Sequence, residues 1–331
     1  SVPFPGRPEY RITYAFPQAI RRALNDFAPD LVHIATPDYL GFRALHWAKA
    51  RDIPVVASHH TQFDAYFAYY RMAWLDAPFW SFVRGFYNAC DEVYAPSPAT
   101  RILLGERGVT TSVRLWRRGI DGELFSPSRR SEAWRASMGF KPHIPVIAFV
   151  GRIVAEKGID VFSDVVKALE AEGIPHHSLV VGDGPGRKSL AEQLPNTSFT
   201  GYLSGAALAE AYASSDVFLF PSHTETFGNV TLEAMASGLP VVVADALGSR
   251  SLVRENETGL LCAPNSVTEF TDAVRLLLAD RDLRVSFGIS GVRFAAEFDW
   301  YIVLDQLIDC YHDVVRRKAR FNDPRERPED H

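Results

Sequence analysis

Short apolar runs alternate with amphipathic stretches along nearly the whole chain. Four such runs stand in the first part of the sequence, "LVHIA", "PVVAS", "EVYAP" and "SVRLW", and four in the second, "PVIAFV", "SLVVG", "DVFLF" and "PVVVA". Strands that are buried on both faces of a parallel sheet have this continuous apolar character, and parallel neighbours need a helical crossover between them. The alternation therefore predicts an α/β fold with parallel sheets throughout.

The chain is long enough for two domains. Its 331 residues exceed the size at which one hydrophobic core keeps growing. The alternation of strands and helices pauses in a polar, proline-containing stretch over residues 128–142, which is typical of a linker. We therefore predict a first domain over residues 1–130, a second over 131–300, and a final helix with a charged tail over 301–331.

Charge is unevenly distributed along the sequence. The net charge of −5 argues against a nucleic-acid-binding protein that relies on bulk electrostatics. Residues 1–130 carry 16 Lys or Arg against 12 Asp or Glu, which gives +4, and the remaining residues carry 19 against 28, which gives −9. The first half is therefore the better partner for an anionic surface such as a membrane.

The cysteines and the hydropathy pattern bear on location. Cys90, Cys262 and Cys310 are odd in number and far apart, which indicates a reducing compartment rather than a disulfide framework. No run approaches the roughly 18 apolar residues that a membrane span needs. These features predict a cytoplasmic protein, peripheral to the inner face of the plasma membrane if it binds one.

Two cations follow the first strand of the second half. In "FVGRIVAEKG" the strand ends at Gly151, Arg152 comes next, and Lys157 precedes an amphipathic helix. Ligands collect at the carboxyl ends of strands in an open α/β sheet, and Arg and Lys complement phosphate oxygens. The pattern indicates a diphosphate site, although two solvated surface cations would give the same pattern.

The stretch "HTETFGNVTLEAMASGLP" places Glu225 in a loop and Glu233 about one turn into a helix that starts after Gly228. The free N–H groups of a first helical turn bind anions, and the helix dipole supports them. A nucleotide-sugar suits this arrangement, with its diphosphate at the helix start, Glu225 on the sugar hydroxyls and Glu233 on the ribose. A capping carboxylate and an ordinary helical glutamate remain the alternative.

Two further patterns are weak. "GDGPGRKSL" resembles a dinucleotide fingerprint but has Arg187 where the third glycine belongs, so a tight turn into a helix explains it equally well. The Asp-x-Asp triplet at residues 280–282 follows the helical run "FTDAVRLLL" and is expected to connect two helices. The sequence therefore favours neither a nicotinamide cofactor nor a metal ion.

The order and spacing of "GRIVAEKG", "GDGP", "FTGYLSGAALAEAYASSDVFLFPSHTETFGNVTLEAMASGLPVV" and "TGLL" resemble the family 4 glycosyltransferases, and the resemblance covers nearly the whole chain. Within that family the chain is most similar to GDP-mannose-dependent α-mannosyltransferases and sulfoquinovosyl-diacylglycerol synthases. The resemblance implies the GT-B fold, in which two Rossmann-like domains face each other across a cleft. It also implies retaining, metal-independent transfer of a hexose, with mannose favoured, from a nucleotide-sugar to an acceptor hydroxyl.

The resemblance assigns roles to particular residues. His60, next to a second histidine at the end of "PVVAS", matches the active-site histidine near the transferred sugar, and adjacent residues on an extended segment point to opposite sides. The catalytic group comprises His60, Arg152, Lys157 and Glu225, and the donor site comprises Gly151, Arg152, Lys157, Glu225, Phe227, Gly228, Asn229 and Glu233.

The acceptor is indicated only by composition. Residues 63–87 are rich in aromatics and include Arg71 and Arg84, with Arg114, Arg117 and Arg118 further along. Aromatic side chains with basic residues suit a membrane interface and a lipid or lipid-linked glycan acceptor, and a buried protein face would have a similar composition.

Two expectations concern the ends of the first domain. The strand, Gly-rich loop and helix with which such enzymes usually begin are not found in this sequence, so the first domain is expected to be incomplete. In this family the final helix returns to the first domain, where Tyr301, Leu304, Leu307, Ile308 and Tyr311 are expected to pack. An inactive or binding-only relative, or a UDP-sugar-dependent glycolipid synthase, remains an alternative to the mannosyltransferase.

Overall fold

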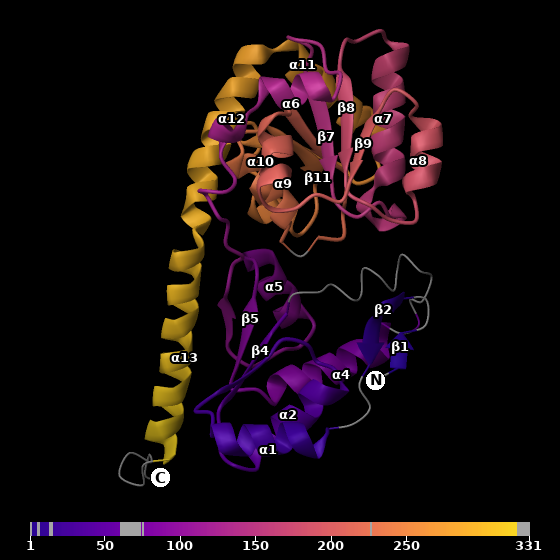
Figure 1. Cartoon of the computed structure of the whole chain (residues 1–331). Coiled ribbons are helices and arrows are strands. Elements are labelled where there is room, and N and C mark those ends of the chain that lie inside the picture. Colours follow the sequence, from indigo (N-terminus) through magenta and orange to yellow (C-terminus); the bar gives the residue numbers. More distant parts are fainter. Residues whose placement is uncertain are drawn as a thin grey trace. The chain divides into compact units, whose positions relative to one another are not determined.

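The computed structural model describes residues 2–4, 7–12, 16–59, 74, 76–225 and 227–322, with the backbone alone for residues 2–12 and 321–322. The chain forms two compact units: Ser1–Arg117 with Leu304–His331, and Arg118–Val303 (Figure 1). The boundary between the two units lies between Arg117 and Arg118, before the polar stretch at residues 128–142 that the sequence predicts to be the linker. Ile120 and Phe125 pack into the core of the second unit, which places this segment there.

The first unit contains a four-stranded parallel sheet in the order β3-β4-β5-β6. Each of its strands coincides with an apolar run in the sequence: β3 Val32–Ile34, β4 Val55–Ser58, β5 Glu92–Ala95 and β6 Val113–Leu115. Helices α2 Tyr39–Lys49, α4 Asp76–Asn88 and α5 Pro98–Glu106 connect the strands and cover one face of the sheet, and α1 Gln18–Phe27 precedes them. The predicted parallel α/β arrangement is confirmed here.

The long helix α13, Trp300–Asn322, covers the other face of this sheet from Leu304 onward. Leu307 and Val314 are buried there against Val56 and Tyr94, and Figure 1 shows α13 running past β5 on the side away from α4. The helix therefore packs on the first unit, as expected from the resemblance.

The prediction of which α13 residues pack on the first unit is partly wrong. Leu307 and Tyr311 do pack on the sheet, whereas Tyr301, Leu304 and Ile308 are 82%, 42% and 48% exposed. The buried positions are Val303, Leu307, Cys310 and Val314, of which Cys310 is partly buried; they recur every three or four residues in a narrow line. Leu304 and Ile308 each follow a buried position by one residue, which turns them about 100° around the helix, and Tyr301 precedes Val303 by two residues.

Ion pairs reinforce this packing. The carboxylate of Glu92 is fully buried and lies 3.1 Å from Nε of Arg114 and 2.5 Å from Arg317 on α13. Arg114 also lies 2.9 Å from Asp313, and Lys318 lies 3.0 Å from Asp52. Arg114 is therefore engaged inside the first unit, which favours the protein-face alternative over the membrane interface for this residue.

An antiparallel pair of strands, β1 Val2–Phe4 and β2 Arg7–Ile12, precedes α1. The apolar-run pattern does not predict it, because this lead contains several prolines and charged residues rather than a buried run.

The second unit contains a six-stranded parallel sheet in the order β12-β11-β10-β7-β8-β9. The strands are β7 Val146–Val150, β8 His177–Val181, β9 Ser198–Gly201, β10 Val217–Phe220, β11 Val241–Ala244 and β12 Gly259–Cys262. β7 comes first in the chain but lies in the middle of the sheet, beside β10. The chain therefore builds the sheet outward in both directions from a switch point between β7 and β10.

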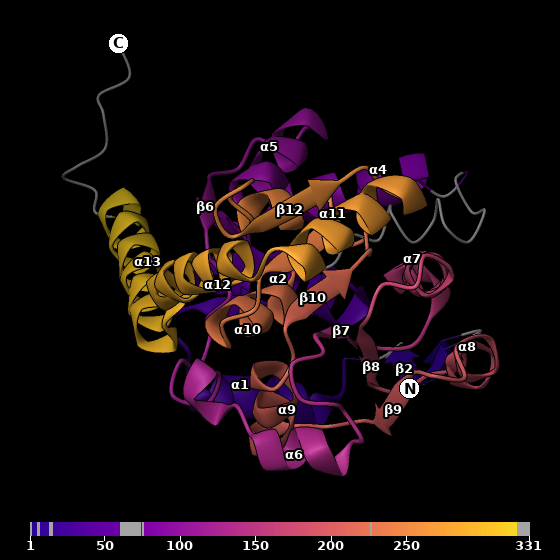
Figure 2. The same ribbon diagram turned by 90° about the horizontal axis from the view of Figure 1, so that it is seen from above.

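Helices cover both faces of this sheet, and right-handed crossovers place α7 and α8 on one face and α10 on the other. Their bounds are α6 Glu132–Ser137, α7 Ile159–Ala171, α8 Arg187–Gln193, α9 Gly205–Ala213, α10 Asn229–Ala236, α11 Val267–Ala279 and α12 Arg281–Ala295. Helix α11 packs on α7, and α9 and α12 pack on α10. Figure 2 shows α7 and α8 at one side of the sheet, with α10 and α12 at the other.

Candidate donor site of the second unit

Two loops meet where the strand order of the second sheet reverses. β7 ends at Val150 and its neighbour β10 ends at Phe220. Open α/β sheets bind ligands at the carboxyl ends of the strands beside such a switch point. The hydroxyls of Ser222 and Thr224 donate to the carbonyl oxygen of Glu156 at 3.4 and 3.3 Å, and these bonds tie the loop after β10 to the loop after β7.

Lys157 and Glu225 form an ion pair between these loops. The Nζ ammonium of Lys157 donates to Oε1 of Glu225, and the hydroxyl of Ser222 lies 3.1 Å from the same oxygen, to which it can donate in place of the Glu156 carbonyl. The two charged side chains are 14% and 18% exposed, so the pair is shielded yet reached by solvent. Lys157, predicted to bind the diphosphate, and Glu225, predicted to bind the sugar, are thus in direct contact. Ser222, which is not among the predicted site residues, contacts the same carboxylate. The one feature of the sequence that could have identified Ser222 is its position just after the central strand β10.

Arg152 follows Gly151 at the end of β7 and is the more exposed of the two loop cations. Its side chain is 47% exposed, and its terminal nitrogen lies 3.7 Å from Oε1 of the buried Glu156. A guanidinium with this much freedom can turn toward an anion while the buried carboxylate keeps it near the loop. Arg152 and Lys157 therefore supply two cations from the loop after β7.

The start of α10 adds hydrogen-bond donors. Gly228 adopts φ +96°, a left-handed conformation that favours glycine, and it immediately precedes Asn229, the first residue of the helix. No side chain of the described residues caps this end, so first-turn N–H groups remain available to a ligand. Phe227 is buried against Phe298, with ring centroids 5.8 Å apart, and this packing anchors the approach to the helix.

Glu233 lies on α10, and its carboxylate is held by Tyr212 of α9. The phenol donates to Oε2 of Glu233 at 3.0 Å. Burial raises the pKa of Glu233 to about 7, and the hydrogen bond from Tyr212 opposes that rise. Burial, followed by the charge of Glu233, raises the pKa of Tyr212 well above 10, so the phenol keeps its proton. Tyr212 stands in an apolar helix, and no sequence pattern singles it out.

The glycine-rich turn after β8 has a structural explanation. A Cβ atom on Gly182 would lie 1.9 Å from the carbonyl oxygen of Gly151, so only glycine allows the two loops to approach this closely. The triplet at residues 280–282 also proves to be a helix junction, because Asp280 ends α11 and its Oδ1 accepts from the N–H of Leu283 at 2.9 Å. Within the described part of the chain, no three His, Cys, Asp or Glu side chains are grouped to hold a metal ion.

His60 lies outside the described residues, as do Arg71 and part of the aromatic stretch. Its neighbour His59 is 3% exposed, and its Nδ1 lies 3.0 Å from the Tyr87 hydroxyl. Burial lowers the pKa of His59 to about 4, so this ring is neutral. His59 is therefore a buried, neutral histidine in contact with Tyr87 of α4.

The described aromatics of the first unit divide into two groups. On α4, Trp80, Phe86 and Tyr87 are buried in the core, which favours the buried-face explanation for these positions. Phe82 is 43% exposed and its ring lies 6.4 Å from that of Phe42, which is 39% exposed. Of the helices in the described part of the chain, none combines the length and apolar composition that crossing a membrane requires.

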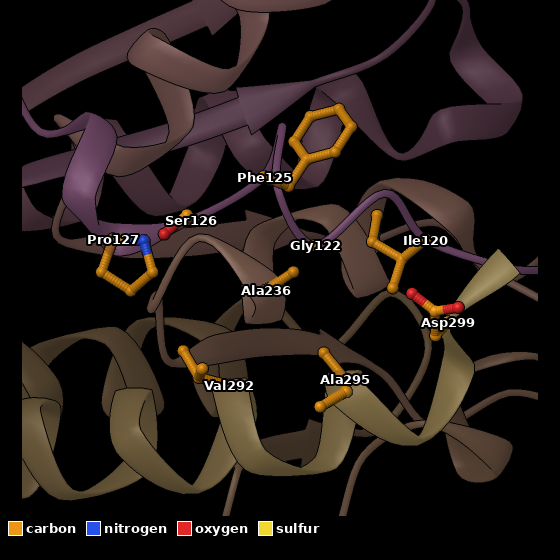
Figure 3. A pocket seen from close by; sticks show the side chains of 10 residues that line it. Ile120, Gly122, Phe125, Ser126, Pro127, Ala236, Val292, Ala295 and Asp299 are labelled. Carbon is orange, nitrogen blue, oxygen red and sulfur yellow. The ribbon is translucent and has the colours of Figure 1, made fainter. Parts of the chain in front are cut away.

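A cavity of about 180 Å³ lies elsewhere in the second unit. Figure 3 shows Ile120, Phe125 and Pro127 on one side of it and Val292 and Ala295 of α12 on the other. The lining is mostly apolar and contains no Lys or Arg. Binding pockets for small molecules usually measure about 300–1,000 Å³, so this cavity is too small and too apolar for a nucleotide-sugar.

Comparison with known proteins identifies two family matches. Residues 130–293 match the family "Glycosyl transferases group 1", and residues 1–124 match "Glycosyltransferase Family 4". Two solved structures have similar folds. One is the sucrose-phosphate synthase of Thermosynechococcus elongatus, with a TM-score of 0.79 at 22% identity over 91% of this chain and 77% of that one. The other is Anabaena HepE in complex with UDP and glucose, with a TM-score of 0.74 at 20% identity over 92% and 84%.

Curated relatives are closer in sequence. The sulfoquinovosyl transferase SQD2 of Arabidopsis thaliana is 36% identical over 308 residues, which are 91% of this chain and 60% of that protein. A GDP-mannose-dependent alpha-mannosyltransferase of Mycobacterium tuberculosis is 36% identical over 302 residues, which are 90% of this chain and 76% of that protein. The chain thus spans three fifths of the plant relative and about three quarters of the bacterial one. It belongs to the group 1, family 4 glycosyltransferases, enzymes of the GT-B fold that transfer a sugar from a nucleotide-sugar.

Proposed function

We propose that this chain is a retaining hexosyltransferase that moves mannose from GDP-mannose to an acceptor hydroxyl without a bound metal ion. The observation that carries the proposal is the meeting of Arg152, Lys157 and Glu225 with the uncapped start of α10 at one switch point. This arrangement offers positive charge, a carboxylate and backbone donors within one pair of loops. A sugar diphosphate needs all three.

The diphosphate is assigned to Arg152, Lys157 and the first turn of α10. Each charge-assisted hydrogen bond to a phosphate oxygen contributes about 1.5–3 kcal/mol. Negative charge grows on the diphosphate as the bond from its oxygen to the anomeric carbon breaks. Cations and N–H groups that already point there stabilise this charge without reorganisation. Gly151 allows the backbone near Arg152 to approach the same phosphates.

The sugar and the ribose are assigned to the two glutamates. Glu225 accepts from hydroxyls of the transferred hexose, beside the backbone of Phe227, Gly228 and Asn229. Glu233 lies about one turn further along α10 and accepts from the ribose hydroxyls. Held at both ends, the donor would present its anomeric carbon in one orientation, which lowers the entropic part of the barrier.

GDP-mannose is favoured as the donor by the mycobacterial relative, whose name states that dependence, at 36% identity. The Arabidopsis relative is equally identical and is named for a different sugar. A UDP-sugar-dependent glycolipid synthase is therefore the second candidate. The binding-only alternative is disfavoured because both cations and both glutamates of the donor site are present.

A lipid or lipid-linked glycan is proposed as the acceptor, reached at an anionic membrane surface. Phe42 and Phe82 are partly exposed and in ring contact, and Arg43 on α2 is also exposed. Aromatic side chains beside a cation suit the headgroup region of a bilayer. The substitution Phe42→Ser with Phe82→Ser should reduce sedimentation with vesicles containing phosphatidylglycerol. An unchanged bound fraction would exclude this surface.

The function is tested by offering the full chain GDP-mannose and several UDP-sugars, with extracted bacterial lipids as acceptors. The expected product carries mannose in the α configuration, as in the donor, and NMR of the purified glycolipid would report this. An inverted anomeric centre would contradict the retaining mechanism. Turnover of a UDP-sugar alone would select the second candidate, and nucleotide binding without turnover of any donor would support the binding-only alternative.

A further inference from the structure

Tyr212 makes an unusual pair of contacts. Its hydroxyl lies 3.0 Å from Oε2 of Glu233 and 3.2 Å from the carbonyl oxygen of Val230, and both acceptors belong to α10. The side chain is fully buried, and its ring packs against Phe125 and Phe218, each with a centroid distance of 5.9 Å. The phenol is therefore fixed in place from behind while its hydroxyl faces the helix that carries Glu233.

A phenol carries one proton, so it can donate to only one of these two acceptors at a time. When Glu233 is ionised, donation to its carboxylate is the stronger choice, because hydrogen bonds to charged acceptors are about twice as strong as neutral ones. When Glu233 is protonated, the phenol can donate to the Val230 carbonyl and accept from the carboxyl group instead. The hydroxyl can thus satisfy Glu233 in either protonation state.

We infer that Tyr212 is a positioning residue for donor binding, which fixes the carboxylate of Glu233 in the ionised form and orientation that grip the ribose. The inference rests on the role proposed above for Glu233. An unheld carboxylate on a helix would sample several rotamers, and a protonated one would lose an acceptor for the ribose hydroxyls. Tyr212 touches the donor only through Glu233.

The charges around Glu233 support this role. Burial raises the pKa of Glu233 to about 7, and of the described side chains Tyr212 is the one whose hydrogen bond lowers it. The charged residues of α12, which packs on α10, are directed elsewhere. Arg281, Asp282 and Arg293 are exposed, and Arg284 donates to the carbonyl oxygens at the end of α11. Glu210 on α9 is partly exposed.

The test is calorimetric titration of the full chain with GDP, and in parallel with UDP, on both sides of pH 7. Wild-type affinity should fall as the pH drops below about 7, because the ionised form of Glu233 binds the ribose. Tyr212→Phe keeps the ring but removes the bond that lowers this pKa. The acid limb of the pH profile, in which GDP affinity falls as the pH drops, should therefore move to higher pH. Affinity near neutral pH should fall about tenfold to a hundredfold.

If Tyr212 only stabilised the fold, Tyr212→Phe would have a different effect on GDP binding. It would lower the melting temperature and weaken GDP binding by the same factor at every pH. Tyr301→Phe removes a phenol that is 82% exposed and serves as the matched control, with no change expected. In steady-state assays Tyr212→Phe should raise the donor KM more than it lowers kcat. A shift confined to kcat would contradict the inference.

A double-mutant cycle separates this inference from the proposed function. If Tyr212 acts through Glu233, adding Tyr212→Phe to Glu233→Gln should cost much less affinity than it costs the wild type. Full additivity would overturn the inference alone. Unchanged GDP affinity in Glu233→Gln would instead remove the ribose role of Glu233 and the proposed donor site with it. If Tyr212→Phe does not fold, 3-fluorotyrosine at position 212, a stronger donor, should move the acid limb to lower pH, and an unmoved limb would refute the idea.

Discussion

The ion pair between Lys157 and Glu225 leads to opposite expectations for its two members. The ammonium of Lys157 is bound by the carboxylate of Glu225. If Lys157 holds the diphosphate as proposed, the diphosphate competes with Glu225 for this cation. Lys157→Met should weaken nucleoside-diphosphate binding, whereas Glu225→Gln should strengthen it, because the cation is then released from its competitor.

The magnitudes follow from the exposure of the pair. Loss of a charge-assisted bond to phosphate costs about 1.5–3 kcal/mol, so Lys157→Met should weaken GDP binding roughly tenfold to a hundredfold. With side chains 14% and 18% exposed, the pair belongs at the upper end of the range for solvent-accessible ion pairs. That upper end is about 1 kcal/mol, so Glu225→Gln should tighten GDP binding about fivefold.

Calorimetry with GDP measures both effects, and turnover of the nucleotide-sugar completes the comparison. Glu225→Gln should bind GDP more tightly yet transfer sugar far more slowly, because the amide has no negative charge and only one acceptor oxygen for the sugar hydroxyls. Lys167→Met and Glu170→Gln on α7 change the same charges on the surface of the same unit and should leave both quantities unaltered. If both variants of the pair weaken GDP binding equally, the competition does not exist and the reasoning is wrong.

Three other predictions concern the metal, the histidine and the long helix. Excess EDTA should leave turnover intact, and a loss that Mg²⁺ or Mn²⁺ restores would contradict leaving-group stabilisation by side chains. His60→Ala should cut turnover sharply while GDP affinity stays nearly constant, because the assigned nucleotide contacts all belong to the second unit; a folded variant that no longer binds GDP would refute this. Glu92→Gln should lower stability by about 1–2 kcal/mol, since Arg114 and Arg317 lose a buried partner but remain solvated. Thermal unfolding would measure this loss, and Asp309→Asn on the exposed side of α13 should change it by less than about 0.5 kcal/mol.

In the second unit the four central strands were predictable from the sequence and the two edge strands were not. Strands such as β7 and β10 have neighbours on both sides and helices on both faces, so their residues read as continuous apolar runs. β9 and β12 form the two edges of the same sheet, and their sequences "SFTG" and "GLLC" are short and contain glycine. An edge strand needs less apolar surface, so the pattern that identifies a central strand fails there.

The meeting of the two loops at the candidate donor site was predictable for a topological reason. Residues just after β7 and β10 must lie side by side once the sheet order reverses between these strands, and this brings Lys157 to Glu225. The sequence could not identify Tyr212, because its contact with Glu233 depends on how α9 packs on α10. Nor could it select the buried line of α13, since Leu307 and Ile308 are equally apolar and only packing distinguishes them.

The first unit is assembled from two segments that are distant in the chain, and this has a consequence for its synthesis. Its sheet has one face covered by helices that precede residue 117, while the other face is completed by α13 from Leu304 onward. On the ribosome, all of residues 118–303 must be made between these two segments. At about 5–20 residues per second, this takes roughly 10–40 seconds.

During that interval Val56 and Tyr94, which are fully buried in the finished protein, face no helix, and Glu92 lacks its partner Arg317. A nascent chain in this state exposes an apolar sheet face, which is the surface that chaperones bind and that drives aggregation. The second unit is continuous in sequence and can complete its core as soon as it has emerged. The N-terminal part of the protein is therefore expected to finish folding last.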